Sequence, residues 1–564
     1  MIGIDLGTTN SLVSFWGDRG VELISNCFGE YLTPSVVSFD ADGTIYVGKT
    51  AKERLVTHPD VTFQEFKRDM GSDVVYRAYG KVYKPEDLSA LVLKQLKQDA
   101  EQALGRPIDE AVISVPAYFN DKQRAATRNA GILAGLKVER LINEPSAAAL
   151  SHHINHIYDS ELFLVFDFGG GTLDVSLVDA FDNVIEIQGV SGDNALGGKD
   201  FNAIIAYDIC ERNGLDWRRL DDKEKAILIR EAENVKIGLT GMDALSTTIR
   251  LGAKEYPYQI SNQDLINISA DLFLRITKVL TKLMNDAEIN VEDVSRVIMV
   301  GGSSKMPVVR HYIASLFDGR LCEEENPDEI VCRGAGVVCG IKERNTDIKD
   351  IMLSDICPFT LGVGITGDIL SPIIEKNQPL PCSHVERYYT SFDMQKCITW
   401  KVYQGENRVA SENLKLTEIT LNVPAKPKGE VHADVRFSYD INGLFDIDIF
   451  CEATNEHYHQ ELGSTSGMSQ AEITRRQAEL DKIKIHPRDM EQNKYILERA
   501  HRLFAQCNQT QQEMLAMSIM KFQNVLEEQN ISKANKAYEE FNKELEVVEG
   551  TLFRFDQFSG DVWK

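Results

Sequence analysis

Two segments of the chain repeat an apolar strand, an aspartate and a glycine-rich turn. They are IGIDLGTTNS at residues 2–11 and LVFDFGGGTLDVS at residues 164–176. A phosphate group binds to a concave row of backbone N–H groups, and glycine permits both the tight turn and the close approach. Two such turns, one on each side of a cleft, would clamp a chain of phosphates. The turn residues are Gly7, Thr8 and Thr9 in the first segment, and Gly169, Gly170, Gly171 and Thr172 in the second.

Neither turn leads into a helix, which excludes a dinucleotide-binding fingerprint and a Walker A loop. One such turn alone would more often be a tight structural turn. The pair, with matched aspartates and a third Gly-Gly turn in VIMVGGSSKMP at residues 297–307, predicts a nucleotide site. Magnesium keeps most of its waters and binds through carboxylates and phosphates, so Asp5, Asp167 and Asp174 suit a Mg²⁺ ion held through water.

The elements that must position these turns alternate along the first part of the chain. AVISVP, ELFLVFDFG and SRVIMVGG are β-branched or aromatic runs that end in turn residues, as buried strands do. LSALVLKQLKQDAEQAL and DKQRAATRNAGILAGL place apolar or small residues three and four apart, as amphipathic helices do. Alternating strands and helices predict an α/β architecture as far as about Arg344.

The pattern changes at DIKDIMLSDICPFTLGV, residues 347–363. From Phe359 to about Glu461, short strands with turn signals predict a β-sandwich, with a hairpin turn at Asn442-Gly443 in which both positions could need positive φ. From Ser469 onward the sequence predicts helices, opened by a capping-box spacing from Ser469 to Glu472. The predicted buried positions of this tail include Met514, Met517 and Leu526.

The predicted domains are an ATPase domain at 1–346, a linker at 347–357, a β-sandwich at 358–467 and a helical lid at 468–564. A chain of 564 residues is too long for one hydrophobic core and should form several domains.

The overall charge and the cysteines argue against several classes of protein, namely nucleic-acid-binding, disulfide-rich and zinc-binding proteins. A net charge of −25 argues against nucleic acid as the main partner. The ten cysteines include no C-x-x-C pair, which indicates reduced thiols and not a disulfide framework or zinc site. No apolar run is long enough to span a membrane and no signal peptide is recognisable, so the expected location is cytoplasmic.

At this point a family resemblance is evident. IGIDLGTTNS, VISVPAYFND, RLINEPSAAAL, FDFGGGTLDVS, GDNALGGKDF, MVGGSSKMP and NPDEIV resemble, in order, the nucleotide-binding motifs of the DnaK-type seventy-kilodalton heat-shock chaperones. KDIMLSDICPFTLGV resembles their interdomain linker, and VYQGE and FSYDINGL their peptide-binding β-domain. LSDICP, SPIIEKN and RFSYDINGL are most similar to the HscC branch.

The resemblance implies a two-lobed actin-like ATPase, a peptide-binding β-sandwich and a short helical lid. It implies slow hydrolysis of ATP to ADP with Mg²⁺, and K⁺ as a further candidate ion. Extended hydrophobic segments of client proteins would bind, with nucleotide state controlling their affinity. A J-domain co-chaperone would stimulate hydrolysis; a nucleotide-exchange factor is a further candidate partner, and the chain would be a monomer that contacts no nucleic acid.

The resemblance also assigns roles to residues of the ATPase domain. Lys67, in EFKRDMG, matches the catalytic lysine, and Glu144 matches the carboxylate near the attacking water. An ammonium beside the terminal phosphate would stabilise the charge that develops there, although a lone lysine is usually a surface charge. The implied catalytic set is Thr8, Lys67, Glu144, Asp167 and Thr172. The implied nucleotide contacts are Asp5, Gly7, Thr8, Thr9, Asn10, Gly169, Gly170, Gly171, Thr172, Glu233, Lys236, Ile237, Thr240, Gly301, Gly302, Ser303, Lys305 and Asp328.

Two further sets follow from the resemblance. The implied peptide groove is lined by Val363, Tyr388, Ile398, Trp400 and Leu444, with Thr366 and Ser391 in an arch over the peptide. From the residues alone, ordinary sandwich core remains an alternative for these positions. The resemblance also implies a set of residues for communication between the domains, which are Pro116, Arg124, Arg140, Asn143, Asp350, Ile351, Met352, Leu353 and Asp355. Among them, the implied J-domain contacts are Arg140, Asn143 and Asp355.

The chain departs from the family pattern at several positions. Ile237 and Lys305 stand where many relatives carry arginines that sandwich the adenine, which predicts weaker nucleotide binding. Lys199 reverses the usual acidic charge, and the sequence does not determine what effect this has. Ser354 replaces an apolar linker residue, which would weaken docking of the linker by up to ~2 kcal/mol.

Three other functions use the same clamp. A small-molecule kinase would need an acceptor pocket with a general base, and it would leave the β-domain unexplained. In an actin-like filament protein the ATPase would be the whole chain. A binding module with an inactive ATPase is opposed by the intact Asp5, Lys67, Glu144, Asp167 and Thr172.

Overall fold

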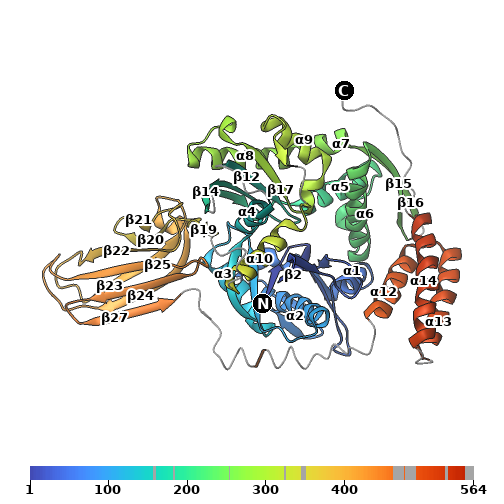
Figure 1. The fold of residues 1–564 in the computed structure, drawn as a ribbon, viewed down its shortest axis with the longest axis horizontal. Coiled ribbons are helices and arrows are strands. Elements are labelled where there is room, and N and C mark those ends of the chain that lie inside the picture. The colour runs from blue at the N-terminus through green and yellow to red at the C-terminus, as the bar shows by residue number, and fades with distance from the viewer. Residues whose placement is uncertain are drawn as a thin grey trace.

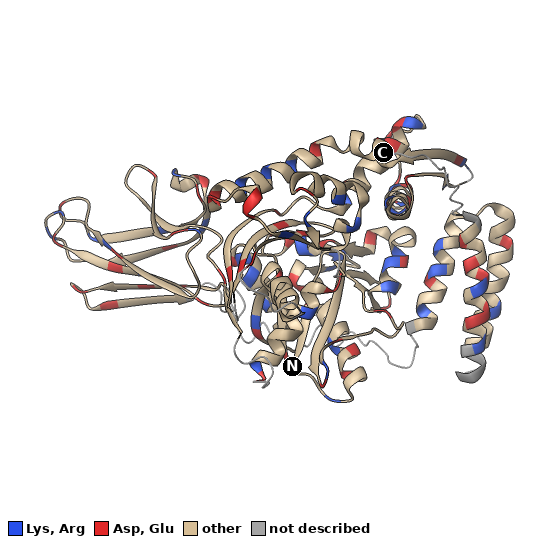
Figure 2. Ribbon diagram, turned by 45° about the horizontal axis from the view of Figure 1, so that its top comes forward, with Lys and Arg blue, Asp and Glu red and all other residues tan. Residues whose placement is uncertain are grey.

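The structure is a computed structural model that describes residues 1–155, 161–181, 184–252, 254–322, 326–343, 351–461, 475–476, 491–527 and 531–552. A two-lobed α/β part lies between a β-sandwich at one end and a helical bundle at the other (Figure 1). Acidic and basic residues are interspersed over all three parts (Figure 2). In the described part of the chain, no helix is long and apolar enough to cross a membrane.

The first lobe is built on a mixed sheet. β1 runs parallel to β10 and antiparallel to β2, so the first glycine turn closes a hairpin. The strand order is β11 (Lys137–Asn143), β10 (Glu110–Val115), β1 (Ile2–Asp5), β2 (Asn10–Gly17) and β3 (Gly20–Ile24), with β4 (Thr33–Pro34) beside β2. The other elements are β5 (Val36–Phe39), β6 (Ile45–Val47), α1 (Lys49–Thr57), η1 (Pro59–Val61), β7 (Thr62–Gln64), η2 (Phe66–Asp69), β8 (Tyr76–Ala78), β9 (Lys81–Tyr83), α2 (Pro85–Leu104) and α3 (Asp121–Leu133).

The second lobe repeats this plan. β12 and β13 form an antiparallel hairpin around the second glycine turn, and they pair Asp167 with Asp174. The strand order is β18 (Leu321–Cys322), β17 (Arg296–Val300), β12 (Glu161–Phe168), β13 (Leu173–Phe181), β14 (Val184–Asp193) and β19 (Met352–Ser354). The other elements are α5 (Gly198–Arg212), η3 (Trp217–Arg219), α6 (Asp222–Gly241), β15 (Ala244–Leu251), β16 (Lys254–Ser261), α7 (Asn262–Ile268), α8 (Ala270–Ala287), η4 (Val291–Asp293), η5 (Gly302–Lys305) and α9 (Pro307–Leu316).

Two helices join the lobes. α4 (Glu144–Asn155) and α10 (Ile330–Lys342) pack so closely that a Cβ atom on Gly334 would lie 1.8 Å from the carbonyl oxygen of Ala147. Their small and aliphatic residues share one buried cluster with both sheets. The two lobes are therefore joined by a tightly packed helix pair. The two glycine turns, one from each lobe, face each other.

The β-domain is a sandwich of two four-stranded antiparallel sheets with one buried core. One sheet has the order β21 (Ile369–Ile374), β20 (Leu361–Ile365), β23 (Cys397–Gln404) and β24 (Leu414–Asn422). The other has the order β22 (Cys382–Tyr389), β25 (His432–Tyr439), β26 (Phe445–Cys451) and β27 (Glu456–Glu461). A short η7 (Ala410–Glu412) precedes β24.

The predicted hairpin turn between β25 and β26 is present, with one difference. Only Gly443 has a positive φ, of 68°, and Asn442 does not. The Asp440 carboxylate accepts hydrogen bonds from the backbone N–H groups of Asn442 and Leu444, which fixes the loop without a second left-handed residue.

The helical bundle consists of α12 (Glu491–Gln506), α13 (Gln509–Glu527) and α14 (Ile531–Leu552). The prediction that Met514 and Met517 are buried is wrong, because these side chains are 63% and 62% exposed. The buried face of α13 is instead set by Leu515, Ile519 and Phe522, spaced four and three apart, and Leu526 packs against it. The predicted capping box at Ser469 and Glu472 lies outside the described residues.

The α/β two-lobed, β-sandwich and helical parts predicted from the sequence are thus confirmed. The position of the bundle was not predicted. It lies against the α/β part, at the end of the molecule opposite the sandwich (Figure 1). In this arrangement it is not a lid over the sandwich.

Candidate active site

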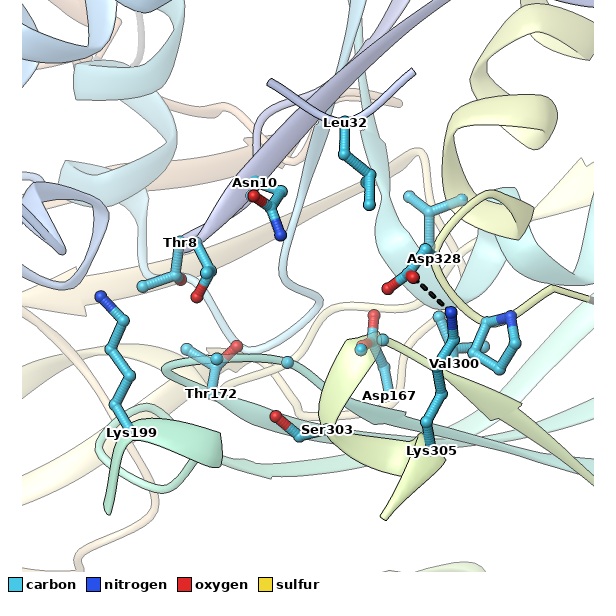
Figure 3. A pocket seen from close by; sticks show the side chains of 18 of the residues that line it. Thr8, Asn10, Leu32, Asp167, Thr172, Lys199, Val300, Ser303, Lys305 and Asp328 are labelled. Carbon is cyan, nitrogen blue, oxygen red and sulfur yellow. Dashed lines mark hydrogen bonds and ion pairs between the residues drawn. The ribbon is translucent and has the colours of Figure 1, made fainter. Parts of the chain in front are cut away.

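A cavity of about 250 Å³ opens between the lobes, where the two glycine hairpins and the turn after β17 converge (Figure 3). Every residue assigned to catalysis or nucleotide binding from the sequence lines this cavity except Gly171, and the predicted metal residue Asp174 also lies outside its lining. The lining residues among those assignments are Asp5, Gly7, Thr8, Thr9, Asn10, Lys67, Glu144, Asp167, Gly169, Gly170, Thr172, Glu233, Lys236, Ile237, Thr240, Gly301, Gly302, Ser303, Lys305 and Asp328.

The two hairpins are pressed together at the closed side of the cavity. A Cβ atom on Gly170 would lie 1.8 Å from the Thr9 hydroxyl oxygen, and one on Gly197 would lie 2.5 Å from the carbonyl carbon of Gly170. These contacts require glycine at both positions. The Thr9 hydroxyl is buried and has no hydrogen-bond partner in the described protein, so the site holds a polar group free to bind an oxygen-rich ligand.

Lys67 and Glu144 form a buried ion pair in the floor of the cavity. Their Nζ and Oε1 atoms are 2.7 Å apart, and both side chains are less than a tenth exposed. Burial alone would lower the pKa of Lys67, but Glu144 and Asp5 outweigh it and raise that pKa. The lysine therefore stays charged, and a cation and a carboxylate are held in contact at the point where the phosphate turns meet.

Three further carboxylates surround this pair. Burial, together with Glu144, raises the pKa of Asp5 to about 6 and that of Asp174 to about 7, and it raises the pKa of Asp167 as well. Ser114 donates to Asp5, and the backbone N–H of Tyr118 donates to Asp174. A cluster of buried carboxylates that repel one another fits a cation, because an added positive charge would restore their normal acidity.

The donor set fits a magnesium ion bound largely through other ligands. Within the described ranges, no three histidine, cysteine or acidic side chains are grouped to hold a metal directly. Mg²⁺ commonly takes only one or two protein carboxylates and completes its shell with water and phosphate oxygens. Asp5 and Asp167 line the cavity, and Asp174 is paired with Asp167 across the β12–β13 hairpin.

The other end of the cavity is more open. Lys305, from η5, forms an ion pair with Asp328, and Figure 3 shows the two side chains at the end away from Lys199. Lys236 donates to the carbonyl oxygen of Gly198, and burial lowers its pKa to about 8. Ile237 is 59% exposed. At the two positions where the resemblance implies arginines, this chain has Lys305, which is already paired with Asp328, and the uncharged Ile237.

Ion pairs between the lobes cross the cleft beside the phosphate turns. Lys199, on α5, lies 2.9 Å from Glu65 of the first lobe, and burial lowers its pKa. Lys52, on α1, lies 3.3 Å from Glu233 of α6. Arg68 donates to both Asp200 and the carbonyl oxygen of Gly171. The reversed charge at Lys199 therefore has a partner on the opposite lobe.

Sequence reasoning missed several lining residues. Asn202 is buried, and its amide oxygen has no partner in the described protein. Its position two residues after GGKD, on the same helix, was the available signal. Val300 and Met306 lie within VIMVGGSSKMP, and Pro327 and Val331 lie within NPDEIV, although the sequence analysis assigned none of the four to the site. No motif marked Leu12 or Leu32.

Arg124 connects the cavity side of the first lobe to the sandwich. Its guanidinium donates to the side-chain oxygen of Asn143 at 2.6 Å, to the carbonyl oxygen of Ala117 at 3.2 Å and to the carbonyl oxygen of Asn442 at 3.3 Å. Pro116 is buried beside it. Burial lowers the pKa of Arg140, and two of its nitrogens have no partner in the described protein.

The predicted linker is docked on the second lobe. Met352–Ser354 forms β19, parallel to β14, a strand that the sequence did not predict. Ile351 and Leu353 pack against the buried cluster between the lobes, whereas Met352 is 64% exposed. Ser354 pairs with Glu186 through the backbone. Ser146 donates to Asp355. Asp350 lies outside the described residues.

The residues assigned to the peptide groove do not form one open surface. Val363, Ile398 and Trp400 are buried in the sandwich core, and Tyr388 packs against it. Leu444 is buried in the hairpin beside Arg124. Thr366 and Ser391 are exposed. In this arrangement Val363, Ile398 and Trp400 are ordinary core residues, which is the alternative that the sequence left open. Part of the sandwich would have to rearrange before a peptide could contact them.

Comparison with known proteins agrees with this geometry. Residues 1–556 match the family model described as Hsp70 protein. A relative described as "Chaperone protein DnaK", from Thermosipho melanesiensis, is 36% identical over 492 residues. The matched region covers 84% of this chain and 82% of that relative.

Proposed function

The chain belongs to the Hsp70 family, and on that premise we propose that ATP binds in the cavity between the lobes and is hydrolysed at its closed end. As a member of this family the protein is an ATP-dependent chaperone. It hydrolyses ATP, uses Mg²⁺ and binds client polypeptides. The observation that carries the proposed location is the buried Lys67–Glu144 pair beside two facing glycine turns.

The proposed mechanism assigns one task to each group at the closed end. The turns at Thr8, Thr9 and Gly169–Thr172 hold the phosphates through backbone N–H groups and hydroxyls. Asp5, Asp167 and Asp174 would hold a Mg²⁺ ion through water, and the ion would supply positive charge beside the phosphate oxygens. Lys67 stabilises charge that develops on the terminal phosphate. Glu144 accepts a hydrogen bond from the attacking water and orients it.

At the open end, Glu233, Lys236, Thr240, Gly301, Gly302, Ser303, Lys305 and Asp328 are proposed to hold the nucleoside. K⁺ is proposed as an additional ion at the phosphates.

Coupling to the sandwich is proposed to run through Arg124 and the docked linker. Arg124 bonds to the Asn442 carbonyl on the sandwich and to Asn143, next to Glu144. A shift at Glu144 would therefore change a contact between the domains, and the peptide site and the nucleotide site would bias one equilibrium. Pro116 and the linker residues Asp350–Leu353 are proposed to take part.

Several partners and boundaries are proposed on the family resemblance. A J-domain co-chaperone would bind around Arg140, Asn143 and Asp355, and a nucleotide-exchange factor would act on the ATPase domain. The proposed groove residues are Val363, Thr366, Tyr388, Ser391, Ile398, Trp400 and Leu444. The proposed domains are 1–346, 347–357, 358–467 and 468–564. A cytoplasmic location, a monomeric state and membership of an HscC-like branch are proposed likewise.

Single-turnover hydrolysis tests the coupling. An apolar peptide and a cognate J-domain should each accelerate hydrolysis by the purified protein, because both would bias the same equilibrium. A rate indifferent to both would contradict the coupling. Cleavage near residue 350 should also yield a folded ATPase fragment and a separate peptide-binding fragment.

The alternative functions are not favoured. The family match runs over residues 1–556 and so includes the sandwich, which neither a small-molecule kinase nor a filament of this superfamily would need.

A further inference from the structure

A second cavity, which we call the side cavity, adjoins the closed end of the nucleotide cavity. Its volume is about 550 Å³, against about 250 Å³ for the nucleotide cavity. Figure 3 shows Thr8 and Lys199 at the end of the nucleotide cavity away from Lys305 and Asp328. The side cavity therefore begins at the phosphate turns, on the far side from the proposed nucleoside contacts. The residues that line both cavities are Thr8, Thr9, Lys199, Asn202 and Glu233.

The shared wall of the two cavities carries buried polar groups. Asn202 is 4% exposed, and neither its amide oxygen nor the Thr9 hydroxyl oxygen has a hydrogen-bond partner in the described protein. The Lys199 ammonium lies 2.9 Å from Glu65 and 3.3 Å from the side-chain oxygen of Gln64. Hydrogen phosphate has anionic oxygens that accept hydrogen bonds and a P–OH group that donates one. A cation, a hydroxyl and an amide oxygen therefore suit it.

Ion pairs between the lobes line the middle of the side cavity. The Arg68 guanidinium lies 3.1 Å from Asp200 and 3.6 Å from Glu65, and the Lys52 ammonium lies 3.3 Å from Glu233. All five side chains are between 22% and 32% exposed. Water reaches these pairs, so they are held weakly and an incoming anion can take the place of a carboxylate.

The outer end of the side cavity opens to solvent at the start of α6. Asp222 and Lys225 line it there, and their side chains are 74% and 32% exposed. Over its whole length the cavity is lined by five basic and four acidic side chains, although the chain has a net charge of −25. A cleft lined by positive charge in an otherwise acidic protein concentrates small anions. The basic residues are Lys52, Arg68, Lys199, Lys225 and Arg230.

We propose that the side cavity is the route by which orthophosphate leaves the closed end while ADP is still bound. In the proposed nucleotide site, the nucleoside of ADP fills the open end, so orthophosphate formed behind it cannot leave that way. Lys199 and Asn202 would take the anion from the phosphate turns, and Arg68 and Lys225 would pass it on to solvent. This route rests on the proposed nucleotide site and on hydrolysis at its closed end.

A single turnover of ATP by the full chain in the presence of Mg²⁺ tests the route. Acid quenching measures cleavage, a fluorescent phosphate-binding protein measures free phosphate, and a fluorescent ATP derivative reports when the diphosphate leaves. The wild-type protein should free phosphate before ADP. Ala203, on α5, lines the side cavity and not the nucleotide cavity, so Ala203→Phe fills the route alone. In this variant phosphate release should slow until it coincides with ADP release, while cleavage keeps the wild-type rate.

Charge reversal at the outer end gives a second, milder test. Lys225→Glu should slow phosphate release by about two- to fivefold, the effect of one partly exposed charge pair. The effect should shrink at high salt, because ions screen exposed charges. Lys223→Glu is the matched control, since Lys223 lies on the same helix, is exposed and does not line the side cavity. It changes the net charge equally and should release phosphate at the wild-type rate.

The possible outcomes separate the route from the nucleotide site. Wild-type cleavage with early phosphate release in Ala203→Phe would overturn the route, and so would a wild-type protein that frees phosphate only together with ADP. Equal slowing by Lys225→Glu and Lys223→Glu would contradict the charged outer end. If Ala203→Phe failed to cleave ATP, Ala226→Phe, which fills the same cavity from α6, would be judged by the same criteria. A wild-type protein that did not cleave ATP would remove the proposed function itself.

Discussion

The two ends of the nucleotide cavity are built differently. At the closed end, Lys67 and Glu144 are both almost fully buried and lie 2.7 Å apart. At the open end, the Lys305 side chain is 40% exposed in its pair with Asp328, and Ile237 is 59% exposed. Removing one partner of a buried pair leaves an uncompensated charge, whereas a half-exposed pair is screened by water. On the proposed site, hydrolysis would depend on a preorganised closed end, and nucleotide affinity would be tuned at a more exposed open end.

Lys67→Met should have the largest effect. It removes the ammonium beside the terminal phosphate, and single-turnover hydrolysis should fall by about 10²–10³-fold, as for loss of one preorganised electrostatic group. Nucleotide binding, measured by calorimetry, should change much less. The exposed Lys137, changed to Met, serves as the control and should hydrolyse ATP at the wild-type rate. Hydrolysis by Lys67→Met within twofold of wild type would remove the proposed role of the closed end.

Lys199→Glu should have the next largest effect. It places a second carboxylate against Glu65, 2.9 Å away on the opposite lobe, and so opposes closure of the cleft. We expect the dissociation constant for ATP to rise by about tenfold, because the Lys199 side chain is only 13% exposed. The charge swap Lys199→Glu with Glu65→Lys should restore most of the affinity. Affinity that stays low in the swapped variant would mean that Lys199 acts on the nucleotide itself and not through Glu65.

Proton release should also distinguish the closed end from the open end. Asp5 and Asp174 have pKa values of about 6 and about 7 in the nucleotide-free protein, and bound Mg²⁺ would return them to the ionised form. Binding of Mg-ADP at pH 6 should therefore release about one proton, detected by calorimetry in buffers of different ionisation enthalpy. Asp5→Asn should release less. Binding without proton release at this pH would contradict the metal-carboxylate assignment.

The same carboxylates also determine the direction in which the free energy of unfolding changes with pH. Their folded-state pKa values lie above the ordinary aspartate value of 3.8, so the native protein binds more protons than the unfolded chain between pH 4 and 7. Their contribution to the free energy of unfolding should therefore fall as pH rises through this window. Denaturant titrations of the nucleotide-free protein should show this fall, and saturating Mg-ADP should reduce it.

Ile237→Arg should have the smallest effect. A guanidinium at this exposed position could stack on a nucleobase, and the expected gain is about two- to fivefold in affinity, as for an exposed cation–π contact. Leu274→Arg, on α8, is the matched control because this leucine is 60% exposed and lies outside the cavity. An equal gain in both variants would point to a general effect of added positive charge on binding of an anion.

Much of the closed end could be predicted because its chemistry lies in contiguous segments. Thr8 and Thr172 stand in glycine-rich motifs whose composition indicates a phosphate site, whereas Lys67 was assigned only through the family resemblance. The partner of Lys199 could not be predicted in this way, because Glu65 belongs to the other lobe and only the fold brings the two together.

The elements that were missed have different physical causes. β19 has three residues and pairs through its backbone, which leaves little side-chain pattern to read. Met514 and Met517 were assigned to the buried face because methionine is apolar, but the helical phase set by Leu515, Ile519 and Phe522 turns them outward. The docking of α12 on α1, in which Arg502 donates to Glu53, depends on charges that in sequence look like ordinary surface residues.

The most direct test of the account is a crystal structure of the protein soaked with Mg²⁺ and a non-hydrolysable ATP analogue. We predict density for the triphosphate between the Thr8–Thr9 and Gly169–Thr172 turns, with its terminal phosphate beside Lys67 and its base near Ile237 and Lys305. An empty cleft, or a nucleotide bound elsewhere on the molecule, would contradict it.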